Sequence, residues 1–77
     1  MSKRRKIFSG QEVVSVLTQS LGFVFVSQKG SHVKLRSDAR GATTIVPLHK
    51  ELALGTFNNV LVLAKVDRRD FLRAASK

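Results

Sequence analysis

Three short stretches of β-type sequence follow one another in the middle of this 77-residue chain, and they restrict its fold more than any other feature. They are Phe23–Ser27, His32–Ser37 and Ala42–Val46. Turn residues with a glycine, Lys29–Ser31 and Asp38–Gly41, separate them. Glycine permits the positive φ of tight hairpin turns, and strands joined by such turns pair antiparallel. We therefore expect a three-stranded meander.

The three stretches differ in their apolar pattern. Phe23–Ser27 is apolar at nearly every position, which predicts a central strand covered on both faces, with Phe23 and Phe25 in the core rather than as platforms for nucleic-acid bases. The third stretch is rich in Thr, Ile and Val, and Pro47 ends it.

A helix is predicted before the strands. Ser9 and Glu12 have the spacing of a capping box, in which each side chain accepts a hydrogen bond from the other residue's backbone amide. Apolar residues then recur at spacings of three and four: Val13, Val14, Val16, Leu17 and Leu21. Since Gly22 suits a left-handed cap, the helix runs from about Gly10 to Leu21.

After the strands the sequence predicts an ordered loop over Leu48–Leu54 and a helix that opens at Gly55 and Thr56. The expected inward residues of this helix are Phe57, Val60, Leu61 and Ala64. Asp67 has the position of an N-cap for a short terminal helix anchored by Phe71 and Leu72.

The order helix, three strands, helix and short C-terminal helix predicts an α+β fold with two layers, in which both helices cover one face of the sheet. We expect a basic N-terminal arm over residues 1–8 and a single domain over residues 9–77. No repeat, low-complexity region or internal linker interrupts the pattern.

Charge restricts the partners. Fourteen Lys and Arg against five Asp and Glu give a net charge of +9, which indicates binding to a polyanion such as nucleic acid, or to an acidic protein. No apolar run approaches the roughly 18 residues of a membrane span, so we expect a soluble, cytoplasmic protein without membrane contact.

The chain has no cysteine and only two histidines, which argues against disulfides and a structural zinc centre. We expect neither metal nor cofactor.

Candidate functional residues cluster at the first turn and the second strand. Because side chains alternate along a strand, His32, Lys34 and Arg36 are expected on one face. Histidine can transfer a proton near neutral pH, and lysine and arginine bind phosphate. In the turn before them, Gly30 lacks a side chain and lets a ligand's backbone come close, next to Lys29 and Ser31. This face is predicted to bind RNA and to be able to attack it.

Several motifs together resemble the HicA family of toxin mRNA interferases, in consistent order from about Ser9 to Phe71. They are Gly22-Phe23, Gln28–Lys34 with its Gly-Ser-His sequence, Pro47–Leu52 and Gly55-Thr56. The resemblance implies a fold like the double-stranded-RNA-binding domain, endoribonuclease activity on mRNA, and neutralisation by a HicB-type antitoxin. It implies that His32 is the essential histidine and Gly30 the motif glycine. The chain departs from the family pattern at Lys65, where a glycine usually follows the second helix, and in its longer basic leader.

A ribonuclease without a metal can use the 2′-hydroxyl of RNA as nucleophile, which requires a base, an acid and cations near phosphorus. His32 is the candidate base or acid. Lys34, together with Lys29 and Arg36, would stabilise the charge that develops on phosphorus. A single catalytic histidine predicts a slow enzyme. For His49 three roles stay open: phosphate donor, second proton carrier, or hydrogen bonding to loop backbone, of which we favour the last.

Two other functions are compatible with the sequence. One is a noncatalytic RNA-binding module that grips duplex RNA by phosphates and 2′-hydroxyls. The other is a small basic protein whose charge only docks an acidic partner. For the toxin we expect mRNA as substrate, a HicB-type antitoxin as partner, and a monomer in the free state.

Overall fold

A computed structural model describes residues 6–76 and has the expected order of elements. These are α1 (Gly10–Ser20), β1 (Val24–Lys29), β2 (His32–Ser37), β3 (Ala42–Pro47), α2 (Leu54–Ala64) and α3 (Arg68–Ala75). The predicted α-β-β-β-α order with a short C-terminal helix is confirmed. Residues 1–5 of the predicted basic arm lie outside the described residues, whereas Phe8, at its end, is buried in the core.

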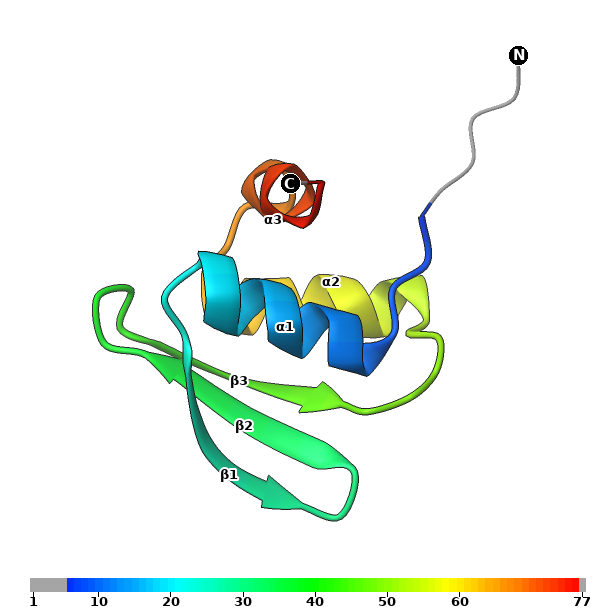
Figure 1. The fold of residues 1–77 in the computed structure, drawn as a ribbon, viewed down its shortest axis with the longest axis horizontal. Helices are drawn as coiled ribbons and strands as arrows, with labels where there is room; N and C mark the ends of the chain where they lie inside the picture. Colours follow the sequence, from blue (N-terminus) through cyan, green and yellow to red (C-terminus); the bar gives the residue numbers. More distant parts are fainter. Residues whose placement is uncertain (1–5, 77) are drawn as a thin grey trace.

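The sheet forms one layer, and α1 and α2 cover one of its faces (Figure 1). The strands lie in the order β1-β2-β3 and both neighbouring pairs are antiparallel, as in the predicted meander. The short helix α3 lies on the side of α1 and α2 that faces away from the sheet (Figure 1). This small α+β domain is consistent with a fold like the double-stranded-RNA-binding domain. None of the described helices is long and apolar enough to cross a membrane.

The prediction that the first strand is central and covered on both faces is wrong. β1 is an edge strand, and all six of its residues are exposed. Phe23, just before the strand, is buried as predicted, but Phe25 is 58% exposed and is not a core residue. The helices cover β2 and β3 and leave β1 without a covering layer, so an apolar sequence here does not produce burial.

β2 has the predicted bounds, and its residues alternate between exposed and buried along its length. Val33 and Leu35 face the helices, while His32, Lys34 and Arg36 face away from them. β3 extends one residue beyond the prediction, to Pro47. The buried residues of these two strands therefore form the part of the core that packs against α1 and α2.

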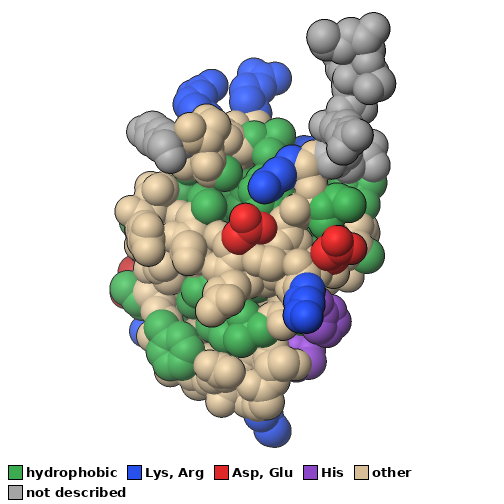
Figure 2. All heavy atoms as spheres, turned by 45° about the vertical axis from the view of Figure 1, so that its right-hand side comes forward, with side chains coloured by type: hydrophobic (Ala, Val, Ile, Leu, Met, Phe, Trp, Pro, Cys, Tyr) green, Lys and Arg blue, Asp and Glu red, His purple; other side chains and the backbone are tan. Residues whose placement is uncertain are grey.

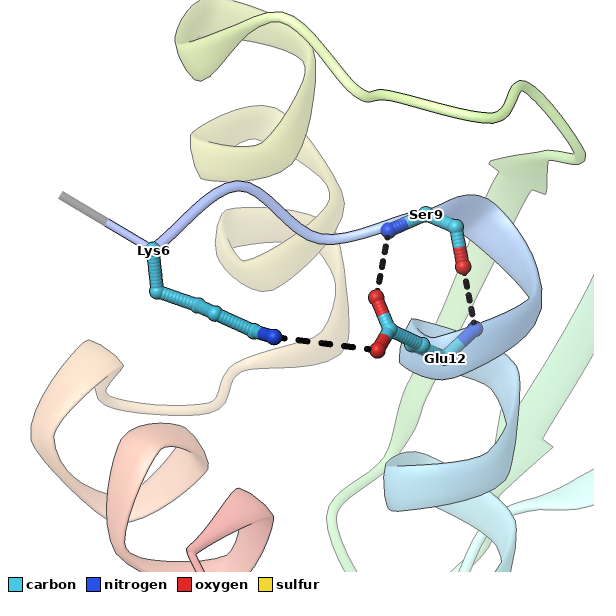
Figure 3. Close-up of polar contacts among 3 residues, drawn as sticks. All are labelled: Lys6, Ser9 and Glu12. Atoms are coloured by element: carbon cyan, nitrogen blue, oxygen red, sulfur yellow. Dashed lines mark hydrogen bonds and ion pairs between the residues drawn. The ribbon is translucent and has the colours of Figure 1, made fainter.

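The start of α1 is the predicted capping box (Figure 3). The Ser9 N–H donates to Glu12 Oε1 (2.9 Å), and the Glu12 N–H donates to Ser9 Oγ (3.0 Å). The hydrogen bond from the Ser9 backbone lowers the pKa of the Glu12 carboxyl, and Lys6, with its Nζ 3.8 Å from Glu12 Oε2, acts in the same direction. Gly22 follows the helix with φ +79°, as expected for a helix-terminating glycine.

Three phenylalanines join the two ends of the described chain to α2. The rings of Phe8, Phe57 and Phe71 have centroids 5.2 to 5.3 Å apart, in stacked and edge-to-face arrangements. Of the two predicted anchors of α3, Phe71 is fully buried and Leu72 is exposed. The four predicted inward residues of α2 are all buried.

The end of α2 has the left-handed cap geometry although Lys65 replaces the expected glycine. Lys65 has φ +57° and ψ +38°, and its N–H donates to the carbonyl of Val62 (3.1 Å). Its own carbonyl accepts a hydrogen bond from Arg40 Nη1 (3.2 Å) in the turn between β2 and β3. The substitution keeps the cap and places a lysine in a backbone conformation that costs it about 1 to 2 kcal/mol.

Candidate nucleic-acid interface

The sheet face that points away from the helices, here called the open face, is where the candidate residues gather. Residues directly opposite each other in antiparallel strands share a face. Lys29 lies opposite His32 across β1 and β2, and Ser27 lies opposite Lys34. Lys34 also lies opposite Ile45 of β3. Pairing of the three strands thus brings Lys29 beside His32 and Lys34, which sequence alternation alone places on one face.

A shallow hollow of about 360 Å³ lies on the open face and is lined by these paired residues. Its lining is Ser27, Lys29, His32, Lys34 and Ile45. Three of the predicted site residues therefore line one hollow. Ser27 and Ile45 were missed by sequence reasoning, because the signal that identifies them is the register of β1 and β3 against Lys34.

The other predicted site residues do not line this hollow. Arg36 is on the open face two residues beyond Lys34, and its Nε lies 3.3 Å from Asp38 Oδ1. Gly30 has φ +59°, and its carbonyl accepts a hydrogen bond from Gln28 Nε2 (3.0 Å). The Ser31 carbonyl accepts from the Leu48 N–H (2.7 Å). In this structure the backbone of the turn positions Lys29 and His32, and Arg36 has a carboxylate partner.

The loop after β3 brings the second histidine to the same region. Pro47 pairs with His32, and the backbone carbonyl of His49 accepts a hydrogen bond from the Gly10 N–H (2.9 Å). The side chain of His49 is exposed, and no hydrogen bond of the described residues involves its imidazole. The bond that the His49 carbonyl accepts comes from α1, and the bond to loop backbone that we favoured for His49 is not found among the described residues. Figure 2 shows histidine surface beside a Lys or Arg side chain.

Gly10 is required at the contact between α1 and this loop. A Cβ at position 10 would collide with the Pro47 carbonyl oxygen and lie 2.8 Å from Leu48 Cα. The close approach lets the first amide of α1 bond the loop, which in turn is bonded to the β1–β2 turn through Ser31. The start of α1, the loop and the turn before His32 are therefore one hydrogen-bonded unit.

Chemically, the hollow combines one imidazole with two ammonium groups, and no carboxylate side chain lines it. Two cations on an exposed concave surface can bind a phosphodiester, and an imidazole beside them can transfer a proton to or from it. Among residues 6–76 there is no group of three His, Cys, Asp or Glu side chains placed to hold a metal ion. The arrangement is suited to acid–base chemistry on an anionic substrate.

Comparison with protein families gives a match. A family model described as the HicA toxin of bacterial toxin-antitoxin systems matches residues 10–66. The match covers more than half of the chain, from the first residue of α1 past the cap of α2, and includes the whole hollow. No curated protein matches the chain.

Proposed function

The chain belongs to the HicA family of toxins of bacterial toxin–antitoxin systems, and from this premise we propose that it is an mRNA interferase. It is an endoribonuclease that cleaves mRNA without a metal ion, uses His32 as its catalytic residue, and is neutralised by a HicB-type antitoxin. The observation that carries the proposal is the position of His32 in an exposed hollow beside Lys29 and Lys34. Its mRNA substrate places its action in the cytoplasm, and mutual repulsion at a net charge of +9 favours a monomer in the free state.

In the proposed reaction the RNA backbone lies across the open face. Lys29 and Lys34 bind the non-bridging oxygens of the scissile phosphate and stabilise the added negative charge of the transition state. The 2′-oxygen attacks phosphorus as its proton leaves, and the bond to the 5′-oxygen breaks as that oxygen gains a proton. The products are a 2′,3′-cyclic phosphate and a free 5′-hydroxyl. His32 transfers one of these two protons, which typically contributes about 10² to 10⁴ in rate.

The test is cleavage of end-labelled mRNA in EDTA by the antitoxin-free protein and by His32→Ala. We expect cleavage by the parent and a rate at least about 100-fold lower for the variant, with an unchanged circular dichroism spectrum because His32 is exposed. His49→Ala is the matched control, since His49 does not line the hollow, and we expect it to lose about tenfold or less. Abolition of parent cleavage by EDTA, or full activity of His32→Ala, would contradict the proposal.

A noncatalytic RNA-binding module is the second candidate, and one observation favours it. The hollow contains a single imidazole and no carboxylate, so it lacks the second imidazole or carboxylate that commonly completes an acid–base pair. In this case parent and His32→Ala would bind RNA equally and neither would cleave it. The cleavage assay described above, run beside an RNA-binding assay, separates the two functions.

A further inference from the structure

β1 is an edge strand of the sheet, and it has two properties of a surface that can accept another strand. It pairs only with β2 among the described strands, so the backbone groups on its outer side have no strand partner. Its first three residues, Val24, Phe25 and Val26, are large, apolar and exposed. Consecutive exposed apolar residues on an unpaired strand are typical of a surface that another chain covers.

The two sides of this edge differ in chemistry. Phe25 lies opposite Leu35 and therefore points to the helix side of the sheet, beyond the area that the helices cover. On the open-face side β1 has Val24, Ser27 and Lys29, so its cation lies at the Lys29 end of the strand, next to His32 of β2. A strand added next to β1 would meet an apolar surface on one side and a basic surface on the other.

We propose that β1 is the docking edge for the toxin's neutralising partner, which adds an extended segment with alternating acidic and apolar side chains. The inference rests on the partner in the proposed function and names the surface that it uses. Alternation in the added strand directs apolar side chains towards Phe25 and acidic ones towards Lys29, which lie on opposite faces of β1. Main-chain hydrogen bonds supply affinity and the side chains supply selectivity, as in other cases of strand addition.

Charge selects an acidic partner over a second copy of this chain. Two copies would each bring a net charge of +9, and pairing of their β1 edges would place basic open faces side by side. An acidic segment removes the repulsion and covers the exposed Phe25 in the same contact.

Docking at this edge also accounts for neutralisation. Ser27 and Lys29 belong to β1 and line the hollow that contains His32. Acidic side chains directed at Lys29 would compete with the phosphate that this ammonium binds. A segment bound along β1 therefore blocks RNA binding in the hollow, because β1 forms one side of it.

Hydrogen exchange tests the surface directly. We expect at least about tenfold slower exchange for amides of residues 24–29 in the complex of toxin and HicB-type antitoxin than in the free toxin. Phe25→Ser should weaken the complex by at least about tenfold. The matched control is Val62→Ser on α2, whose parent residue is 70% exposed, and we expect it to bind like the parent. Both replacements remove an exposed apolar side chain, so both variants should fold.

The outcomes separate this inference from the proposed function. Two results would refute the docking edge without affecting the proposed function. One is a complex in which the β1 amides exchange as fast as in the free toxin. The other is equal affinity of Phe25→Ser and Val62→Ser for the antitoxin. Protection of β1 that rises with the concentration of free toxin shows a second copy on the edge and also overturns it. Absence of any complex overturns the partner as well, whereas ribonuclease activity is measured on the free toxin and is judged separately.

Discussion

Phe25 of β1 and Leu35 of β2 lie directly opposite each other on the same face of the sheet, yet their environments are opposite. Phe25 is 58% exposed and Leu35 is fully buried. The helices lie over β2 and β3 and do not extend over β1 (Figure 1). Burial in this protein therefore follows the position of the helices, and the hydrophobicity of a strand does not by itself report it.

The difference divides the sheet into a covered half, formed by β2 and β3 with their helices, and an uncovered edge, formed by β1. The covered half holds the core and the hydrogen bond from Thr44 Oγ1 to the Val60 carbonyl (2.9 Å). The uncovered edge contributes Lys29 and Ser27 to the hollow and leaves Phe25 exposed. Stability is expected to depend on the first region and partner binding on the second.

The largest expected effect compares the two opposed residues themselves. Leu35→Ala removes a fully buried side chain and should lower the free energy of unfolding by about 2 to 5 kcal/mol. Phe25→Ala changes an exposed position and should lower it by less than about 1 kcal/mol. Urea denaturation of both variants measures the difference. Equal losses would show that β1 contributes to the core and would remove the basis of the comparison.

Gly10→Ala tests what holds α1 over the covered half. The new Cβ collides with backbone atoms of Pro47 and Leu48, which cannot rotate away, so we expect a loss of about 1 to 3 kcal/mol in unfolding free energy. Gly55→Ala in α2 is the matched control, because, apart from its chain neighbours and the backbone of its own helix, no atom lies within 4 Å of its new Cβ. This control should be neutral or stabilising by up to about 1 kcal/mol. A neutral Gly10→Ala would refute the close contact.

Lys34→Ala and Arg36→Ala distinguish two cations of the open face. Lys34 lines the hollow and Arg36 is paired with Asp38 at 3.3 Å, so RNA affinity should fall more for Lys34→Ala. We expect a loss of about tenfold for Lys34→Ala. The slope of log affinity against log salt should become shallower by about 0.7 for one phosphate contact to single-stranded RNA. Fluorescence anisotropy across salt concentrations measures both, and equal losses would place the phosphate contacts outside the hollow.

The smallest expected effect concerns the end of α2, which Lys65 joins to the turn between β2 and β3. Lys65→Gly relieves a left-handed residue and keeps the backbone carbonyl that Arg40 binds, so the protein should gain about 1 kcal/mol in stability. Lys50→Gly is the control, because Lys50 has no positive φ and its replacement only adds freedom to the unfolded chain. A higher melting temperature for Lys65→Gly alone is the expected result.

Much of the local structure was predictable from the sequence. The bounds of β2, the capping box at Ser9 and Glu12, and the N-cap at Asp67 are confirmed, because each depends on residues close together in the chain. The predicted faces of β2 are also as expected, since alternation needs only an extended backbone. The Gly-Ser-His motif predicted functional residues at the first turn, and the structure places this turn beside the hollow.

Other features were decided by the tertiary structure. Strand register brought Ser27 and Ile45 to the hollow, although they lie 18 positions apart in the chain. The position of the helices left β1 at an uncovered edge, where the apolar sequence had predicted a central strand. Periodicity reports the conformation of a segment and which residues share a face. Which face is covered, and by what, depends on contacts between distant segments, which a local pattern does not contain.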